Sequence, residues 1–343
     1  MKSTTLSCGL SLQFCKALLA VLAAGGVLCA ESGVFFVDGT RGSDDNPGTL
    51  RWPFRTIQAA VDAAEEHQGK DTVVILPGEY EEAVSISDQY PLVVRGRGAV
   101  VIHAPEPPEG GDADPAVAIK ESKYVVLEGL VFALNPDRGV KAKKTGTLVI
   151  RNCRFEGNGG DGIKVKESDR LIVQNVVCQG NDDGLDLEEV KQIEVRNTRL
   201  YANEDEGLEV DNAEKVIVQR VIACNNGNEG LDIDDSTRIF VTDVYCCRNG
   251  GSGFQAESSG DNPQTVRKLV IMRGIFRDNG AHGIQIMEGE DEDTGEKGDI
   301  QKVTLYCIVA IGNAESGLDI EFEGQLTLQG IVSVGNGSED VLP

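Results

Sequence analysis

The chain has 343 residues and a formal net charge of −24, from 32 basic and 56 acidic side chains. A surface this acidic repels nucleic acid and anionic membranes, so we expect neither a nucleic-acid partner nor insertion into a membrane. Aromatic residues make up only 5% of the chain, which leaves few platforms for stacking bases or neutral sugars.

Residues 1–30 have the pattern of a secretory signal peptide. Lys2 and Lys16 precede an apolar run over residues 17–27, and small residues follow near Cys29. The apolar run is too short to span a bilayer. We therefore expect cleavage near the end of this segment and a mature protein that is secreted, periplasmic or attached to the cell surface.

Residues 31–91 differ from the repeats that follow them. The run 56–66 carries aliphatic residues at helical spacing, with Thr56 in the position of an N-cap. A strand is predicted over 72–76, because branched aliphatics there end at Pro77-Gly78. A helix ahead of a stacked sheet covers its open edge, so this part is predicted to be an N-terminal cap with a short helix and the first strands.

From residue 92 to 343, a glycine followed by alternating aliphatic residues recurs at intervals of 22, 23, 23, 23, 30 and 34 residues. A nearly fixed period of this length indicates one structural unit stacked on itself. Short strands without helices in each unit predict an all-β fold, a right-handed parallel β-helix built as a single-stranded solenoid, and we expect a monomer. The two long intervals contain polar insertions that should loop out. The glycines are Gly162, Gly184, Gly207, Gly230, Gly253, Gly283 and Gly317.

An asparagine recurs in the turn of each repeat. Asparagine tolerates left-handed backbone geometry and can hydrogen-bond its copy in the next unit, so we interpret this series as a structural ladder. Its members are Asn158, Asn181, Asn203, Asn226, Asn249, Asn279 and Asn313.

Cys224 and Cys247 lie at equivalent positions in neighbouring repeats. Strand spacing would hold their backbones roughly 4.8 Å apart, which permits a disulfide. We favour the simpler interpretation, in which both cysteines pack as small apolar side chains in a stack.

Residues between the inward aliphatics should point outward and form columns along one face. The first column reads Lys141, Lys164, Asp186, Glu209, Asp232, Gln255, Gln285 and Asp319. The second reads Lys143, Lys166, Glu188, Asp211, Asp234, Glu257, Met287 and Glu321. One face thus changes from basic to strongly acidic within two coils.

The start of the acidic part is a candidate calcium site. Carboxylates stacked about 4.8 Å apart repel each other by roughly 3 to 4 kcal/mol per pair at an effective dielectric constant near 20. A calcium ion relieves that repulsion, and Asp182, Asp183 and Asp186 offer three oxygen ligands from one coil. Asp161 from the preceding coil would complete the set. The alternative is an acidic face that is simply solvated.

Three N-terminal stretches resemble the opening of secreted β-helix proteins of the pectin-lyase-like superfamily. They begin Phe36-Val-Asp-Gly-Thr, Trp52-Pro-Phe-Arg-Thr and Leu76-Pro-Gly-Glu-Tyr. Within that superfamily, Asp182-Asp-Gly-Leu-Asp186 is similar to the calcium-binding stretch of family 9 pectate lyases. In that family another aspartate comes from the preceding coil, where Asp161 lies here.

This resemblance implies an activity, a cofactor and a partner. In family 9 pectate lyases, calcium acidifies the proton next to a uronate carboxylate and a lysine removes it, so that the glycosidic bond breaks by β-elimination. The implied function is a calcium-dependent lyase, with Ca²⁺ as cofactor and an acidic polysaccharide as substrate.

The catalytic base departs from the family pattern. The family lysine lies in a Gly-Phe-Lys-Leu strand one coil after the calcium motif, where this chain has Gly207-Leu-Glu-Val with Glu209. Lys164, one coil before the motif and in the same column as Asp186, is a candidate replacement. The catalytic candidates are therefore Lys164 and Glu209, and the alternative role for Lys164 is a salt bridge to Asp186.

Two other functions fit the repeats. One is a non-catalytic surface, carbohydrate-binding or structural β-helix. The other is a polygalacturonase-like glycosidase, because Ala281-His282-Gly resembles the His-Gly strand of those enzymes. His282 lies four repeats beyond Asp183, roughly 19 Å along the stack at one strand spacing per coil, which is too far for the two to act together.

Overall fold

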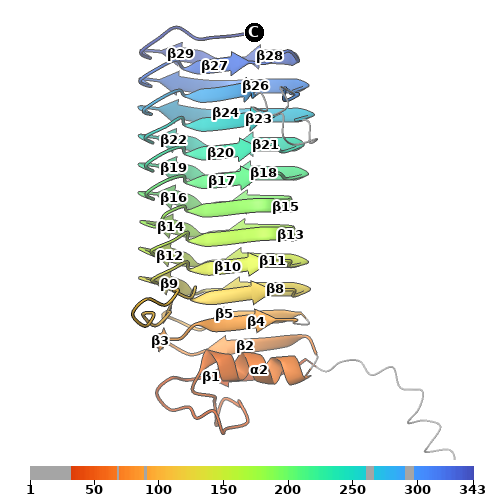
Figure 1. The fold of residues 1–343 in the computed structure, drawn as a ribbon, viewed down its shortest axis with the longest axis vertical. Helices are drawn as coiled ribbons and strands as arrows, with labels where there is room; N and C mark the ends of the chain where they lie inside the picture. Colours follow the sequence, from red (N-terminus) through yellow and green to blue (C-terminus); the bar gives the residue numbers. More distant parts are fainter. Residues whose placement is uncertain (1–31, 68, 89–90, 260–265, 290–296) are drawn as a thin grey trace, which may run out of the picture.

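The computed structural model describes residues 32–343 except 68, 89–90, 260–265 and 290–296. The 29 strands of the described residues belong to one parallel sheet that winds into an elongated stack of coils, which confirms the predicted parallel β-helix (Figure 1). The predicted signal peptide lies outside the described residues, as does part of each polar insertion. Among the described residues, no helix is long and apolar enough to cross a membrane.

A short helix lies at the N-terminal end of the stack, as predicted (Figure 1). This helix, α2 (Ile57–His67), packs against β1 (Val34–Val37), β2 (Asp71–Ile75) and β4 (Val84–Ser87). The Oγ1 of Thr56 accepts a hydrogen bond from the backbone N–H of the third residue of the helix, at 3.2 Å, as an N-cap does. The buried face comprises Ile57, Ala60, Val61 and Ala64.

Three parallel ladders of strands form the sides of the β-helix. Strand β1 pairs with β2, and β2 pairs with the strand that begins at Leu92. The sheet of the N-terminal cap therefore continues directly into the sheet of the repeats. Ladder A, which carries the outward columns, consists of β4, β7 (Val117–Lys120), β10 (Val140–Lys143), the start of β13 (Ile163–Gln174), the start of β15 (Leu185–Arg196), β17 (Leu208–Asp211), β20 (Leu231–Asp234), β23 (Phe254–Ser258), β25 (Ile284–Glu288) and β27 (Leu318–Glu321).

The other two ladders complete each coil. Ladder B consists of β1, β2, β5 (Leu92–Gly96), β8 (Tyr124–Glu128), β11 (Thr147–Arg151), the ends of β13 and β15, β18 (Lys215–Gln219), β21 (Arg238–Thr242), the starts of β24 (Lys268–Arg277) and β26 (Lys302–Ile311), and β28 (Gln325–Gln329). Ladder C consists of β3 (Gly78–Glu81), β6 (Val100–His103), β9 (Val131–Ala133), β12 (Arg154–Glu156), β14 (Val177–Gln179), β16 (Arg199–Tyr201), β19 (Ile222–Cys224), β22 (Tyr245–Cys247), the ends of β24 and β26, and β29 (Val332–Val334).

The hydrophobic core runs inside the coils. In ladder A the aliphatics on either side of each outward residue are buried, as with Leu185 and Leu187, which are 0% exposed. Burying such a side chain contributes about 1.5 to 3 kcal/mol. Phe132 and Phe155 stack in the core with ring centroids 4.8 Å apart. The alternation therefore fixes which residues face outward and can form a site.

The asparagine ladder forms as predicted and extends one coil further at each end, to Asn135 and Asn336. In each step, the side-chain amide of one asparagine donates to the Oδ1 of the asparagine in the next coil, as from Asn203 to Asn226 at 2.9 Å. The left-handed conformation, however, falls on other residues such as Asn175, with φ of 54°. None of the ladder asparagines among the described residues has a positive φ. Hydrogen bonding alone therefore accounts for the ladder.

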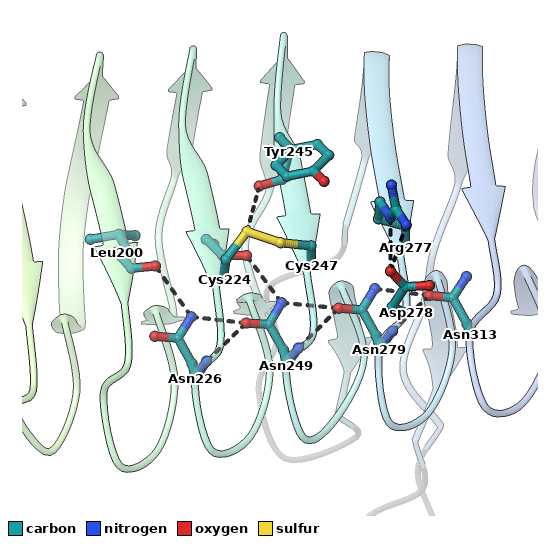
Figure 2. The surroundings of a disulfide bond; sticks show 11 residues. Leu200, Cys224, Asn226, Tyr245, Cys247, Asn249, Arg277, Asp278, Asn279 and Asn313 are labelled. Carbon is teal, nitrogen blue, oxygen red and sulfur yellow. Dashed lines mark hydrogen bonds and ion pairs between the residues drawn. A yellow bond between two sulfur atoms is a disulfide. The ribbon is translucent and has the colours of Figure 1, made fainter.

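Cys224 and Cys247 are joined by a disulfide beside the asparagine ladder (Figure 2). Their Cα atoms lie 4.6 Å apart, the distance between neighbouring coils. Our favoured interpretation of two unbonded apolar side chains is therefore wrong for this pair, because equivalent positions in adjacent coils bring the sulfur atoms together. Packing as a small apolar side chain does describe Cys153, Cys178 and Cys246, which are buried free thiols.

Reduction of this disulfide should destabilise the protein by about 3 kcal/mol, because the bond closes a loop of moderate length in the unfolded chain. Urea unfolding with and without dithiothreitol measures the effect. A double variant, Cys224→Ser with Cys247→Ser, is the control and should unfold at the same urea concentration in both conditions. A wild-type midpoint that does not move on reduction would contradict the prediction.

Candidate functional site

Three of the predicted calcium ligands come together on ladder A. Asp161 and Asp183 each precede the glycine that opens a strand, and Asp186 is the first outward residue of β15. One carboxylate oxygen from each of the three lies within 4.8 Å of the others. We call this group the aspartate cluster. Asp182, the fourth predicted ligand, is exposed and does not belong to it.

Two cationic side chains pair with the aspartate cluster. The Nε of Arg138 donates to the Oδ2 of Asp161 at 2.5 Å. Lys164 pairs with the Oδ2 of Asp186 and with the Oε1 of Glu188. The salt bridge between Lys164 and Asp186 that we considered from the sequence is therefore present.

Burial and mutual repulsion raise the pKa values of Asp183 and Asp186 in the aspartate cluster. Burial, a hydrogen bond with the Glu206 side chain and the nearby negative charges raise the pKa of Asp183 to about 9. Burial also raises the pKa of Asp186, although the ion pair with Lys164 opposes that rise. Without a further cation, at least one carboxyl group of the cluster holds a proton at neutral pH.

The cluster fits a hard divalent cation. The Oδ1 of Asp186 is buried and has no hydrogen-bond partner among the described residues. An unpaired buried carboxylate oxygen is costly, and calcium prefers carboxylate oxygens as ligands. Asp161, Asp183 and Asp186 would hold the ion, in competition with Lys164 for the last of these side chains. The sequence-based assignment of calcium to these three residues stays a prediction.

The two candidate bases differ in their surroundings. Burial disfavours the charged form of Lys164, but its ion pairs with Asp186 and Glu188 outweigh that and raise its pKa. Its proton is therefore held firmly. Glu209 is partly buried, lies beside Asp186 in strand register, and makes no hydrogen bond or ion pair within the described part of the chain. Burial and the charges of Asp186 and Glu206 raise its pKa to about 7.

The charge change predicted along ladder A is present. On its N-terminal side, Lys120, Lys141 and Lys143 are exposed. On its C-terminal side lies an open groove of about 360 Å³ that begins at Glu188 and Glu209. The remaining acidic residues of this groove are Asp211, Asp234, Asp235 and Glu257.

The alternative site at His282 is separate. Its Nδ1 lies 2.7 Å from the Oγ of Ser316, and its Nε2 lies 2.9 Å from a carboxylate oxygen of Glu315 and 3.3 Å from one of Asp319. None of these partners belongs to the aspartate cluster, so the glycosidase arrangement gains no support.

The sequence analysis missed Arg138, which neutralises part of the aspartate cluster. A signal for it existed in the glycine repeat, because Arg138 precedes Gly139 just as Asp161 precedes Gly162. Extending the repeat by one coil toward the N-terminus would have placed the guanidinium next to that aspartate.

The structure resembles solved β-helix enzymes. The mannuronan C-5 epimerase AlgE4 A-module of Azotobacter vinelandii has 18% identity and a TM-score of 0.60, over 90% of this chain and 97% of that one. Pectate lyase Pel9A has 15% identity and a TM-score of 0.51, over 89% of this chain and 79% of that one. At these identities the likeness concerns the fold alone. A search of curated protein sequences gave no match.

Two family models match the sequence. One, described as a protein of unknown function, DUF1565, matches residues 40–103. The other, described as a right handed beta helix region, matches residues 111–244 and 138–324, which together cover more than half of the chain. The strands from β7 to β27 fall within the second match, and the chain belongs to the right-handed β-helix family.

Proposed function

We propose that this protein is an exported, calcium-dependent lyase that cleaves an acidic polysaccharide by β-elimination. The observation that carries the proposal is the buried, unpaired Oδ1 of Asp186 in a cluster of three aspartates, at the point where lysines give way to carboxylates. Mannuronan and pectate, which the similar enzymes are named for, are both polymers of uronic acids. That fold-level likeness supports the substrate class.

Charge explains why a cation is needed. A uronan would be repelled by a protein of net charge −24, and most strongly by the acidic groove. Lys120 and Lys141 are exposed and pair with no acidic side chain in the described part of the chain, so they are available for the carboxylates of the polymer. Asp161, Asp183 and Asp186 would hold a calcium ion, whose charge would attract the next carboxylate of the polymer and make the carbon-bound proton beside that carboxylate more acidic.

Glu209 is the better proton acceptor of the two candidates. Its pKa near 7 leaves a large fraction ionised at neutral pH, whereas the ion pairs of Lys164 keep that side chain protonated. In the proposed step, Glu209 takes the proton on the carbon next to the uronate carboxylate. The electron pair of that C–H bond forms the C=C bond, the bond to the glycosidic oxygen breaks, and this oxygen takes a proton from water.

The test is incubation with polygalacturonate, polymannuronate and polyguluronate, with calcium or with a chelator. Cleavage should appear as the ultraviolet absorbance of the unsaturated uronate, and only with calcium. Asp186→Asn and Glu209→Gln should each lower the rate by about 100-fold or more. Glu321→Gln, on the same face but far from the cluster, should not. If no uronan yields unsaturated product, the lyase proposal is wrong.

A second candidate function is non-catalytic calcium-dependent binding of the same polymer. The observation that favours it concerns Lys164, which lies beside Asp186 in strand register on its N-terminal side. This lysine forms ion pairs with the carboxylates of Asp186 and Glu188 and is therefore not free to act as a base. Calcium-dependent retention of the protein on a uronan matrix, without any unsaturated product, would support this candidate.

A further inference from the structure

A second group of carboxylates lies on the same side of the molecule, further toward the C-terminus. One oxygen each from Glu206, Glu229 and Asp232 lies within 4.8 Å of the others. Glu206 and Glu229 precede the glycines that open β17 and β20, and Asp232 is the first outward residue of β20. We call these three residues the second carboxylate cluster.

This cluster differs from the first in having no cationic partner. In the described residues, no lysine, arginine or histidine forms an ion pair with any of its three members. Neutral groups donate three hydrogen bonds to them. These are Asn228 Nδ2 to Glu206 Oε1 at 2.7 Å, Ser252 N to Glu229 Oε1 at 3.3 Å and Gln255 Nε2 to Asp232 Oδ2 at 3.3 Å.

One ligand position is left open within the cluster. The Oδ1 of Asp232 is buried and has no hydrogen-bond partner in the described part of the chain. Glu206 and Glu229 are each only 8% exposed, so water reaches their charges poorly, although Asp232 as a whole residue is partly exposed. Buried carboxylates require a counter-charge or protons, and a set made only of oxygen ligands matches a hard divalent cation.

From this we infer that Glu206, Glu229 and Asp232 form a second divalent-cation site of the calcium type. It is distinct from the aspartate cluster, although Glu206 links the two. Its backbone N–H donates to Asp183 Oδ1 at 2.8 Å, and its side chain forms a hydrogen bond with the Asp183 carboxyl group. Unlike the first site, it requires no arginine or lysine to move away. The inference goes beyond the proposed function and does not depend on catalysis, because cation binding is measured without any polysaccharide.

Calcium titration of the full protein after chelator removal, by calorimetry and equilibrium dialysis, tests the inference. The wild type should bind two ions. Asp232→Asn should bind one, and so should Asp186→Asn, while the double variant should bind none. Glu321→Gln, which removes one exposed charge from the same face, should still bind two.

Each outcome separates this inference from the proposed lyase. One ion in the wild type, with no loss in Asp232→Asn, would overturn the second site and leave the first intact. One ion lost only in Asp232→Asn would support the second site and count against the first. Thermal unfolding in chelator checks the fold of the variants, and Glu229→Gln provides an independent second variant that should also lose one ion.

Discussion

In the presence of a chelator, the protein is expected to unfold at a midpoint roughly 10 °C lower at about pH 9 than at about pH 5. The reason is the set of carboxyl groups whose pKa is raised by burial and mutual repulsion, to about 9 for Asp183 and to about 7 for Glu209 and Asp234. In the unfolded chain these groups titrate near pH 4. Between these values the folded protein binds more protons than the unfolded chain.

The sign follows from that difference in bound protons. Stability contributed by a raised carboxyl pKa is complete below about pH 4 and is lost as the pH rises through the folded values, first near 7 and then near 9. We expect a total loss on the order of 5 kcal/mol.

Scanning calorimetry across this pH range measures the loss of stability. Asp183→Asn should flatten the slope, because an amide does not titrate, and Glu321→Gln should not. Saturating calcium should restore stability at alkaline pH through ligand linkage. A midpoint that rises between pH 5 and 9 in chelator would contradict this account.

Asn203→Leu should destabilise the protein by about 3 to 6 kcal/mol, because leucine has nearly the same shape as asparagine but makes no hydrogen bonds. The side chain of Asn203 donates to Asn226 Oδ1 at 2.9 Å. It also accepts from the backbone N and the side-chain Nδ2 of Asn181, at 3.3 and 3.2 Å. The substitution leaves buried polar groups of both neighbours without these partners.

Chemical denaturation compares this variant with Gln174→Leu, which changes an exposed amide in a nearby coil and should cost less than about 0.5 kcal/mol. A loss for Asn203→Leu no greater than that of the control would show that the ladder contributes little to stability.

The helical spacing of residues 56–66 was sufficient to predict the cap helix, and the glycine and aliphatic pattern was sufficient to predict the β-helix and its outward columns. Those features depend on strand alternation and period, which can be counted in a sequence. The sequence also predicted that Asp161 lies near Asp183 and Asp186, because residues at equivalent positions of neighbouring repeats stack on one another.

The directions of side chains at the edge of the site could not be predicted from the sequence. Asp182 and Asp183 are adjacent in sequence, yet Asp182 is exposed, whereas Asp183 is buried and accepts a hydrogen bond from the backbone N–H of Glu206 in the next coil. Likewise, the spacing of Cys224 and Cys247 permitted a disulfide or simple packing, and the choice depends on torsion angles that the repeat does not encode.

The direction of the asparagine ladder limits how such a molecule changes in length during evolution. From Asn135 to Asn313, each side-chain amide donates to the Oδ1 of the next asparagine, so these amide-to-amide hydrogen bonds have a single direction that ends at Asn336. A gain or loss of one whole coil preserves each donor and acceptor, whereas a few extra residues within a coil would place a wrong side chain in the series. Length is therefore expected to change by duplication or deletion of complete turns, with any remaining residues expelled as surface loops.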